Sequence, residues 1–448
     1  MASIRSRSSE SNDPPKLDLN GIGQPVDMLG NSPTAKPPTS VNVLVLDEEL
    51  PYPPDTGKRI RTWNLTQRLA SRHSITFLCY GKREGQTKIA GLTVETVRPP
   101  SHFTGWRLYV RLFLNLFSIY PFSVSKHYSK GFSRRLKAVL KQKRFDLVQC
   151  EWTPYAIYAQ HLNSLPLIVV MHNVESQIWF RRAQVSKTLA ERIFFYLQAK
   201  KMQWFERRAL RSADGVTAVS TLDAHAALAW GAQQVSIVEN GVDLQKFKPM
   251  PDPDTHEILF VGSLDWYPNV DAIKFFLFEI FPLLGRSVPD AKLCIVGRRP
   301  TSSLVQLVQT KPDVCLIPDV EDVRPYLARA ATIVVPLRIG GGTRIKILEA
   351  FAMGKAVVST SIGCEGLEVV DGVHLLVADK PSTFATSITK LLVSKVERER
   401  LAQNGLALAR RRYSWEDCAK RLENAWFSVC SHNVRASSNP HMEARAHK

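Results

Sequence analysis

Runs of consecutive apolar residues alternate with amphipathic segments along the first half of the chain. Segments such as 58–72 and 188–212 have the spacing of helices that bury one face. Strands that are apolar throughout and are separated by helices are typical of a parallel sheet covered on both faces. The strands expected from this pattern are 41–48, 74–80, 146–151, 165–175, 215–220 and 235–241.

The alternation stops in the proline-rich stretch 242–256 and begins again after it. The sequence therefore predicts an α/β protein with two doubly wound domains, at 41–241 and 257–413, joined by a linker at 242–256. The strands expected in the second domain are 257–264, 291–297, 314–319, 331–337, 356–361 and 374–379.

The two ends of the chain lack this pattern. Residues 1–40 are rich in Ser, Pro and Asp, and we expect a disordered tail there and at 431–448. No run of about 18 apolar residues occurs, so no bilayer-spanning helix is expected. The seven cysteines include no CxxC pair, and four fall in apolar runs, as is typical of buried thiols in a cytoplasmic protein. These four are Cys79, Cys150, Cys294 and Cys315.

Basic residues are concentrated in the first domain. Up to residue 240 the chain has 32 Lys and Arg against 18 Asp and Glu, a net charge of +14, whereas the remainder carries +4. No acid lies between Glu95 and Asp146, and the interval 103–144 interleaves basic with aromatic and Leu side chains. Such a segment suits peripheral contact with the anionic inner face of a membrane. An ordinary basic surface over a core of Phe and Leu is the alternative. Nucleic acid is not expected as a partner, because no DNA- or RNA-binding motif accompanies the charge.

A glycine-rich segment in the second domain carries the strongest chemical signal. Residues 338–349 read RIGGGTRIKILE, between an expected strand and a helix that begins near Thr343. A glycine loop at a helix N-terminus, beyond the carboxyl end of a parallel strand, suits an anion. Lys346 can meet a phosphate there, while Glu349 accepts hydrogen bonds from sugar hydroxyls. A phosphate beside ribose hydroxyls describes a nucleotide. An internal ion pair of Glu349 with Lys346 or Arg344 is the alternative.

This segment resembles the donor-site motif of the retaining GT-B glycosyltransferases of family 4 (glycosyl transferases group 1). Further similar motifs follow in the family's order over most of 41–430, and they are PYPPDTGKRIR, MHNVE, SADGVTAVS, VENGVDLQKF and GSLDWYPNVDAI. Within the family, the chain resembles the sugar transferases of polysaccharide biosynthesis. The resemblance implies two Rossmann-like domains that face each other across a cleft. The second domain would hold a nucleotide sugar and the first an acceptor. The last helix, 414–430, would pack back onto the first domain.

The family uses two glutamates eight positions apart, and one of them is missing here. Glu349 corresponds to the ribose-binding glutamate, whereas Gly341 stands where the hexose-contacting glutamate is expected. The resemblance assigns a contact with the donor sugar to His172, and it places the backbone of Gly57 near the phosphates. A satisfied loop histidine and a plain turn glycine are the alternatives.

The diphosphate-binding residues differ from the family as well. The family's Arg and Lys, five residues apart, correspond to Ser263 and Pro268. Arg344 and Lys346 are the cations available in their place. Backbone N–H groups of the glycine loop would add to them, namely those of Gly340, Gly341, Gly342 and Thr343.

Five other polar positions are assigned as follows. Asp265 and Asn269 are expected to border the cleft, with Asn269 as a helix cap. Glu365 is expected to be a solvated loop acid, and an approach to the ligand is the alternative. Metal-dependent transferases of another architecture use Asp-x-Asp, and the one such spacing, Asp252-Pro-Asp254, is expected to be solvated linker. No metal site is therefore expected.

These features predict a retaining, metal-independent hexosyltransferase that needs no cofactor beside its nucleotide-diphosphate sugar. The acceptor would be a saccharide or a lipid-linked saccharide in the synthesis of a surface polysaccharide or glycoconjugate. Arg344, Lys346, Glu349 and His172 are the expected catalytic residues, and the missing glutamate favours front-face substitution without a covalent intermediate. A nucleotide-sugar epimerase of the same architecture and a non-catalytic nucleotide-sugar-binding subunit of a polysaccharide complex are the alternatives.

Overall fold

The computed structural model describes residues 40–100, 104–162, 164–186, 188–285, 287–340 and 344–437, the last six of these by their backbone alone. The tail expected at 1–40 lies outside the described residues apart from Ser40, as does the end of the chain from residue 438. Within the described ranges, no helix has both the length and the apolar character needed to cross a bilayer.

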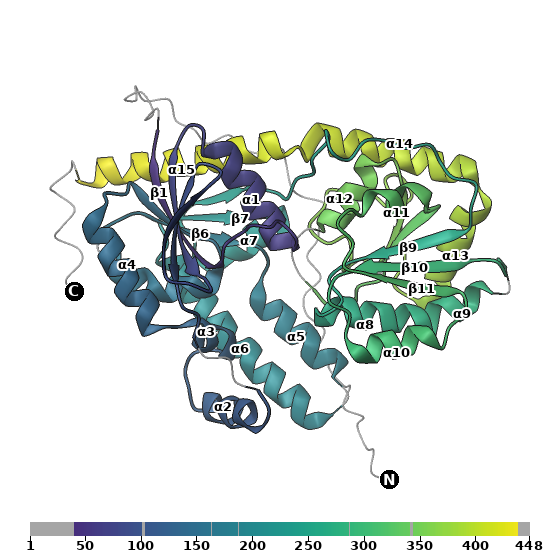
Figure 1. The fold of residues 1–448 in the computed structure, drawn as a ribbon, viewed down its shortest axis with the longest axis horizontal. Coiled ribbons are helices and arrows are strands. Elements are labelled where there is room, and N and C mark those ends of the chain that lie inside the picture. The colour runs from purple at the N-terminus through teal and green to yellow at the C-terminus, as the bar shows by residue number, and fades with distance from the viewer. Residues whose placement is uncertain are drawn as a thin grey trace, which may run out of the picture. The chain divides into compact units, whose positions relative to one another are not determined.

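The first domain is built on a mostly parallel eight-stranded sheet in the order β3-β4-β2-β1-β5-β6-β7-β8 (Figure 1). Among the described strand pairs of this sheet, β3–β4 alone is antiparallel. The strands are β1 Asn42–Glu49, β2 Ser74–Tyr80, β3 Gly85–Ile89, β4 Leu92–Val97, β5 Leu147–Cys150, β6 Leu167–Met171, β7 Gly215–Ala218 and β8 Val235–Ile237. The helices are α1 Gly57–Leu69, α2 Trp106–Leu116, α3 Phe122–His127, α4 Lys130–Gln142, the 3-10 helix η1 Thr153–His161, α5 Glu175–Val185, α6 Leu189–Arg211 and α7 Thr221–Ala229.

Alternate residues of β1 enter different cores, which explains its continuous apolar pattern. Leu44 and Leu46 lie in one hydrophobic cluster with residues of α4, η1 and α6. Val43 and Val45 lie in another, with residues of α1 and of the last helix. Both faces of the sheet are therefore covered, as the sequence predicts. Strands β3 and β4 were not predicted. Strand β3 is exposed or half-buried and has no apolar run, and in β4 Thr93, Glu95 and Thr96 interrupt the apolar residues.

The second domain contains a parallel six-stranded sheet in the order β11-β10-β9-β12-β13-β14. Cys315 is exposed, contrary to the expectation of a buried thiol, because β11 is the edge strand. The strands are β9 Glu257–Val261, β10 Lys292–Gly297, β11 Val314–Pro318, β12 Thr332–Val335, β13 Ala356–Ser359 and β14 Leu376–Val377. The helices are α8 Tyr267–Phe275, the π-helix η2 Phe276–Ile280, α9 Phe281–Leu284, α10 Ser302–Gln309, α11 Arg324–Arg329, α12 Ile345–Ala352, α13 Pro381–Val393 and α14 Lys395–Arg412.

The linker is tied to the second domain by a partly buried ion pair. Arg398 on α14 donates to both carboxylate oxygens of Asp252 at 2.7–3.0 Å. The same guanidinium donates to the carbonyls of Leu391 and Leu392. The expectation that Asp252 is solvated is therefore wrong, because its partner lies 146 positions away and was not visible in the local sequence.

The last helix, α15 Trp415–Ser437, packs on the first domain (Figure 1). It includes 431–437, so the expectation of a disordered tail from residue 431 is wrong over that range. Trp415, Leu422 and Trp426 lie in the same hydrophobic cluster as β1 and α1. The indole Nε1 of Trp426 donates to Gln149 Oε1 at 2.7 Å, at the end of β5. The C-terminal helix thus belongs to the hydrophobic core and the polar network of the first domain.

Gly405 lets α14 approach α12 closely. A Cβ atom at this position would lie 2.5 Å from Cδ1 of Phe351, a fully buried ring on α12. We predict that Gly405→Ala lowers the free energy of unfolding by about 1–2 kcal/mol, because overpacking costs about 1–3 kcal/mol and the better helix propensity of Ala returns at most about 1 kcal/mol.

Urea unfolding measures this change, and Gln403→Ala on an exposed position of the same helix is the control. We expect the control to shift the unfolding free energy by less than about 0.5 kcal/mol. A Gly405→Ala variant as stable as the control would contradict the close approach of the two helices.

Candidate active site

The glycine-rich segment follows β12 and precedes α12, as expected. Gly341, Gly342 and Thr343 lie outside the described residues, and Arg344 occupies the N-cap position of α12. Gly340 has a φ of 148°, and the Arg344 guanidinium occupies the space that a Cβ atom would need there. A residue with a side chain would therefore displace the arginine from the start of the helix.

Lys346 reaches from the first turn of α12 to the carboxyl end of β9. Its Nζ donates to Asn269 Oδ1 at 3.2 Å and lies 4.7 Å from the centre of the Phe260 ring. Burial, aided by the positive charge of Arg344, lowers the pKa of Lys346 to about 7. The expected cap role of Asn269 is wrong, because Trp266 holds the N-cap position of α8 and Asn269 lies inside the helix.

Glu349 lies one turn further along α12 and is half-buried. No side-chain hydrogen bond or ion pair of Glu349 is found among the residues that the structure describes. Burial raises the pKa of Glu349 to about 7, although the charges of Lys246 and Lys346 oppose the shift. The alternative of an ion pair with Lys346 is not realised, since that ammonium bonds to Asn269 instead.

Arg344 is only 8% exposed, and burial lowers its pKa to about 10. The carboxylate of Glu365 lies near it and receives two hydrogen bonds, of 2.6 and 2.7 Å, from Arg181 on α5. Arg181 also donates to the Gly340 carbonyl and so joins the first domain to the glycine loop. Glu365 is therefore an ion-pair partner and not the solvated acid that was expected. Arg181 was not singled out from the sequence, since nothing local marks it.

His172 directly follows β6, at the same sheet edge as the end of β5. Its Nε2 lies 2.5 Å from the backbone carbonyl of Glu151 and 3.5 Å from Glu151 Oε1. Because a carbonyl can only accept, Nε2 carries the proton and Nδ1 is left as an acceptor. Burial, with the charges of Arg61 and Lys58, lowers the pKa of His172 well below its usual value, so the ring is neutral.

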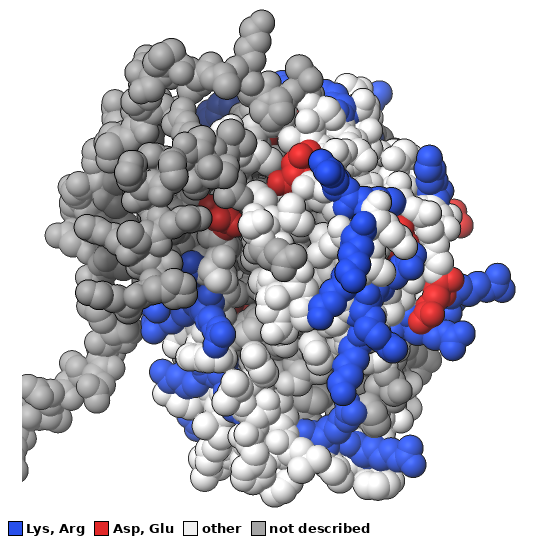
Figure 2. All heavy atoms as spheres, turned by 90° about the vertical axis from the view of Figure 1, so that its left-hand side faces the viewer, with Lys and Arg blue, Asp and Glu red and all other residues white. Residues whose placement is uncertain are grey.

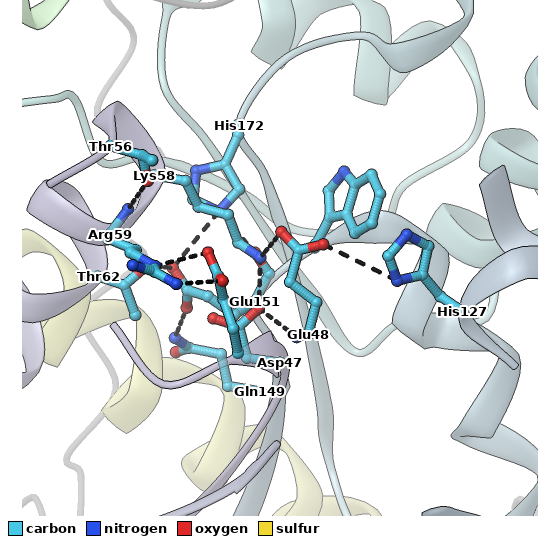
Figure 3. Close-up of polar contacts among 12 residues, drawn as sticks. Asp47, Glu48, Thr56, Lys58, Arg59, Thr62, His127, Gln149, Glu151 and His172 are labelled. Carbon is cyan, nitrogen blue, oxygen red and sulfur yellow. Dashed lines mark hydrogen bonds and ion pairs between the residues drawn. The ribbon is translucent and has the colours of Figure 1, made fainter. Parts of the chain in front are cut away.

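A polar cluster that the sequence did not reveal lies beside His172 (Figure 3). Asp47 and Glu48, near the carboxyl end of β1, both bind the ammonium of Lys58 on α1, with Glu48 Oε1 at 2.9 Å. Burial raises the pKa of Asp47 to about 7, in spite of this ion pair. The sequence does contain a signal for this cluster. The first apolar run ends in acidic residues, and the helix that follows it begins with basic residues.

Gly57 is the first residue of α1 and is exposed, with no atom within 4 Å of the position that a Cβ atom would take. The start of α1 is thus open to solvent at the carboxyl edge of the sheet. Asp55, just before it, accepts a hydrogen bond from Arg298 at the end of β10. Asp265 pairs loosely with Arg299 on the same side of the second domain.

Buried hydrogen bonds hold the carboxyl end of β5 and Glu151, the residue that follows it, in place. Gln149 Nε2 donates to Glu151 Oε2 at 2.6 Å, and Thr62 Oγ1 donates to Glu151 Oε1 at 2.8 Å. Gln149 in turn accepts from Trp426 of α15. Burial raises the pKa of Glu151. The C-terminal helix, α1 and β5 thereby fix the backbone carbonyl that orients His172.

Comparison with known proteins agrees with this arrangement. The family model described as "Glycosyl transferase 4-like domain" matches residues 56–241, and the model "Glycosyl transferases group 1" matches residues 255–394. An uncharacterized 44.6 kDa protein in the cps region of Klebsiella pneumoniae is 20% identical over 83% of this chain and 96% of its own length.

Solved structures share the fold at low sequence identity. Sucrose-phosphate synthase from Thermosynechococcus elongatus is 16% identical with a TM-score of 0.67, over 89% of this chain and all of that chain. HepE from Anabaena, in complex with UDP-glucose, is 14% identical with a TM-score of 0.62, over 87% of this chain and all of that chain. The two family models together cover more than half of the sequence, and the chain is accordingly a glycosyltransferase of the GT-B fold that belongs to the glycosyl transferases group 1 family.

Proposed function

We propose that this glycosyltransferase is a retaining, metal-independent hexosyltransferase that uses a nucleotide-diphosphate sugar. The observation that carries the proposal is the placement of two cations, Arg344 and Lys346, at the start of α12, with Glu349 one turn away. Both cations are largely removed from water, which strengthens their attraction for a diphosphate. The helix N-terminus adds a favourable dipole and free backbone N–H groups.

Glu349 is the residue best suited to bind the ribose of the nucleotide. Its carboxylate has no internal partner among the described residues, so its oxygens are available to accept hydrogen bonds from two neighbouring hydroxyls. A carboxylate beside a diphosphate is tolerated only if cations lie between them, and Lys346 lies on the preceding turn of the same helix face. UDP is the first nucleotide to test, because HepE of the same fold was solved with UDP-glucose.

The transfer step that we propose is front-face substitution. The bond between the anomeric carbon and the diphosphate oxygen breaks while the acceptor oxygen bonds to the same face of that carbon. The proton of the acceptor hydroxyl passes to the departing phosphate oxygen, so no protein nucleophile is required. Arg344 and Lys346 stabilise the charge that develops on the diphosphate. His172 Nδ1, as an acceptor, would hold a hydroxyl of the donor sugar.

We predict that one nucleotide sugar from a panel of UDP-, GDP-, ADP- and dTDP-sugars releases its nucleoside diphosphate in the presence of EDTA. Lys346→Ala should lower the rate about 100-fold, because it removes a charge from the leaving-group site. Glu349→Ala should raise the donor KM about 10-fold or more through loss of charged hydrogen bonds. Lys274→Ala, on an exposed position of α8, is the matched control and should change neither constant.

Proton NMR of the product tests retention, and mass spectrometry of the quenched enzyme tests for a glycosyl adduct. An inverted anomeric configuration or an isolable adduct would contradict front-face transfer. Tight binding of a nucleotide without turnover, even with lipid extract as the acceptor source, would instead favour the non-catalytic subunit.

The low pKa of Lys346 gives a test that does not require turnover. A bound diphosphate favours the charged ammonium, so UDP affinity should fall as the pH rises above about 7, by up to about tenfold per pH unit. The pKa of Glu349 is also about 7, so its titration would overlap with that of Lys346. The effect of pH on UDP binding is therefore compared between Glu349→Gln and the double variant Glu349→Gln/Lys346→Arg. In calorimetric titrations between pH 7.5 and 9, the UDP affinity of Glu349→Gln should fall steeply with rising pH. The UDP affinity of the double variant should stay constant over the same range. If the UDP affinities of the two variants change equally with pH, the diphosphate does not bind next to Lys346.

We also propose that the first domain binds the inner face of an anionic membrane, where a lipid-linked acceptor would be found. Helix α2 buries only Asn115, while its large apolar residues face solvent. Trp106, Tyr109 and Phe113 are 60–72% exposed, and Phe117 after the helix is 78% exposed. The helix is held at its carboxyl end, where Lys201 and Gln198 of α6 bond to Asn115.

Basic side chains gather on the neighbouring surface of the first domain (Figure 2). Helix α4 buries Phe132, Leu136 and Val139, in agreement with the alternative of a basic surface over a core of Phe and Leu. Its other face is basic and exposed. Each cation near an anionic surface contributes about 1 kcal/mol, and the exposed rings of α2 would enter the headgroup layer. The exposed basic residues of this segment are Lys126, Lys130, Arg134, Lys137, Lys141 and Arg144.

We predict that the protein floats with phosphatidylcholine vesicles that contain phosphatidylglycerol, and less with phosphatidylcholine alone. The double variant Phe113→Glu/Phe117→Glu should weaken binding at least about tenfold, because each inserted ring contributes about 1.5–3 kcal/mol. Val396→Glu, which alters an equally exposed apolar residue on α14, is the control. Equal flotation with both vesicle types would exclude the electrostatic contribution, and an unaffected double variant would exclude insertion of α2.

A further inference from the structure

Two cysteines lie side by side in the sheet of the second domain. Cys294 on β10 and Cys315 on β11 are direct partners in the parallel register of these strands, which are neighbours in Figure 1. Side chains at paired positions of neighbouring strands share one face of the pleated sheet. The two thiols therefore face the same way, although they lie 21 positions apart in the sequence and form no CxxC motif.

The pair lies away from the proposed donor site. Cys315 is the second residue of β11 and Cys294 the third of β10, whereas the donor site is placed beyond the carboxyl ends of the strands. The function proposed above makes no use of either thiol.

The spacing of the two strands suits a disulfide bond. Paired strands lie about 4.7–4.9 Å apart, and the Cα atoms of disulfide-bonded cysteines lie about 4.4–6.8 Å apart. Strand β11 is at the edge of the sheet, next to β10. A small shift of β11 that brings the two Cβ atoms closer together therefore disturbs no strand on its other side.

The two thiols differ in their access to solvent. Cys315 is exposed, whereas Cys294 is only 1% exposed. A solute can reach Cys315 directly, and Cys294 lies beneath it as a second sulfur. An exposed cysteine with another cysteine beside it is typical of redox-sensing thiols, in which the second thiol reacts with the oxidised first one.

Arg329, at the end of α11, places a positive charge beside the pair. Its Nη2 donates to Cys294 Sγ at 3.4 Å, and its Nε donates to Glu257 Oε1 at 2.8 Å, which fixes the guanidinium. A hydrogen bond from the Cys294 thiol, aided by the charge of Arg329, lowers the pKa of Cys315 to about 7, although burial and Glu257 oppose the shift. The same hydrogen bond and burial raise the pKa of Cys294. Cys315 is therefore the thiolate of the pair, and a thiolate is the form that attacks an oxidant.

We propose that Cys315 and Cys294 form a redox-active dithiol that a hydroperoxide oxidises to a disulfide. The Cys315 thiolate attacks the terminal oxygen of the hydroperoxide and breaks its O–O bond. Cys315 becomes a sulfenic acid, and the departing alkoxide or hydroxide takes a proton from solvent. Cys294 then attacks the sulfur of the sulfenic acid, and its proton leaves with the hydroxyl group as water. The two thiols lose two electrons in total, and the hydroperoxide gains them.

Arg329 acts as a positioning residue in the second step. Once Cys315 is a sulfenic acid, it no longer carries the negative charge that held the proton on Cys294. The guanidinium at Cys294 Sγ then favours the thiolate of Cys294, which is the attacking form in disulfide formation.

Mass spectrometry of the full-length protein after treatment with hydrogen peroxide, with a metal chelator present, tests the proposal. We expect a bond between Cys294 and Cys315, measured as the loss of two hydrogens from the linked peptides and reversed by dithiothreitol. Tryptic cleavage after Arg298 separates the two cysteines, so the linked peptides are distinguished from either peptide alone. Cys430 on α15 is the internal control and should stay reduced, because burial raises its pKa to about 11.

Serine variants separate the two steps. In Cys294→Ser, oxidation should stop at the sulfenic acid of Cys315, and trapping with dimedone should give at least about five times more adduct than in the unaltered protein. In Cys315→Ser, Cys294 should stay reduced, because no exposed thiolate reacts first. Arg329→Gln should raise the ratio of dimedone adduct to disulfide at least about twofold, and an unchanged ratio would contradict its role in the second step. Unchanged circular dichroism shows that each variant is folded.

Alkylation of Cys315 by iodoacetamide gives a measurement that needs no oxidant. Its rate should reach half of its maximum near pH 7, whereas a cysteine with the ordinary pKa reaches it near about 8.5. Absence of the bond between Cys294 and Cys315 after peroxide treatment would overturn the proposal. Alkylation of Cys315 with the pH dependence of an ordinary cysteine would overturn it as well.

Discussion

Burial of parallel strands on both faces is the constraint on which the rest of this structure depends. A strand covered on both sides has no room for charged side chains along its length, so polar groups collect where the strands end. In the first domain these are Asp47, Glu48 and His172, and in the second they are the glycine loop and the start of α12. The proposed donor site follows from this one feature of the sheets. Both sheet edges hold charges that are partly removed from water, which is why their pKa values depart from the usual range.

The carboxyl edges of the two sheets carry side chains of opposite charge. Arg344 and Lys346 give the second domain a cationic edge that suits a diphosphate. Glu48 and Glu175 give the first domain hydrogen-bond acceptors that suit hydroxyls, since Lys58 is already paired. This difference would orient a transfer in which an anionic leaving group stays with one domain and a neutral acceptor binds to the other. Arg181 joins the two edges through Glu365 and the Gly340 carbonyl.

The sequence predicted the elements that depend on local pattern and failed where a distant partner decides. Apolar runs located the other strands of both sheets, but not β3, which is exposed or half-buried at the sheet edge, nor β4, in which polar residues interrupt the apolar ones. The glycine segment located Lys346 and Glu349 on one helix. The ion pairs of Asp252 with Arg398 and of Arg181 with Glu365 were missed, because the partners lie 146 and 184 positions apart. The assignment of Asn269 as a cap failed for a local reason, because α8 begins before it, with Trp266 at the N-cap position.

The central claim is that the start of α12 binds a nucleoside diphosphate. A crystal structure of the protein soaked with UDP tests this most directly. The account predicts the diphosphate within hydrogen-bond distance of Arg344 and Lys346, with both ribose hydroxyls on the carboxylate of Glu349. A nucleotide bound elsewhere, or one whose ribose lies away from Glu349, would contradict it.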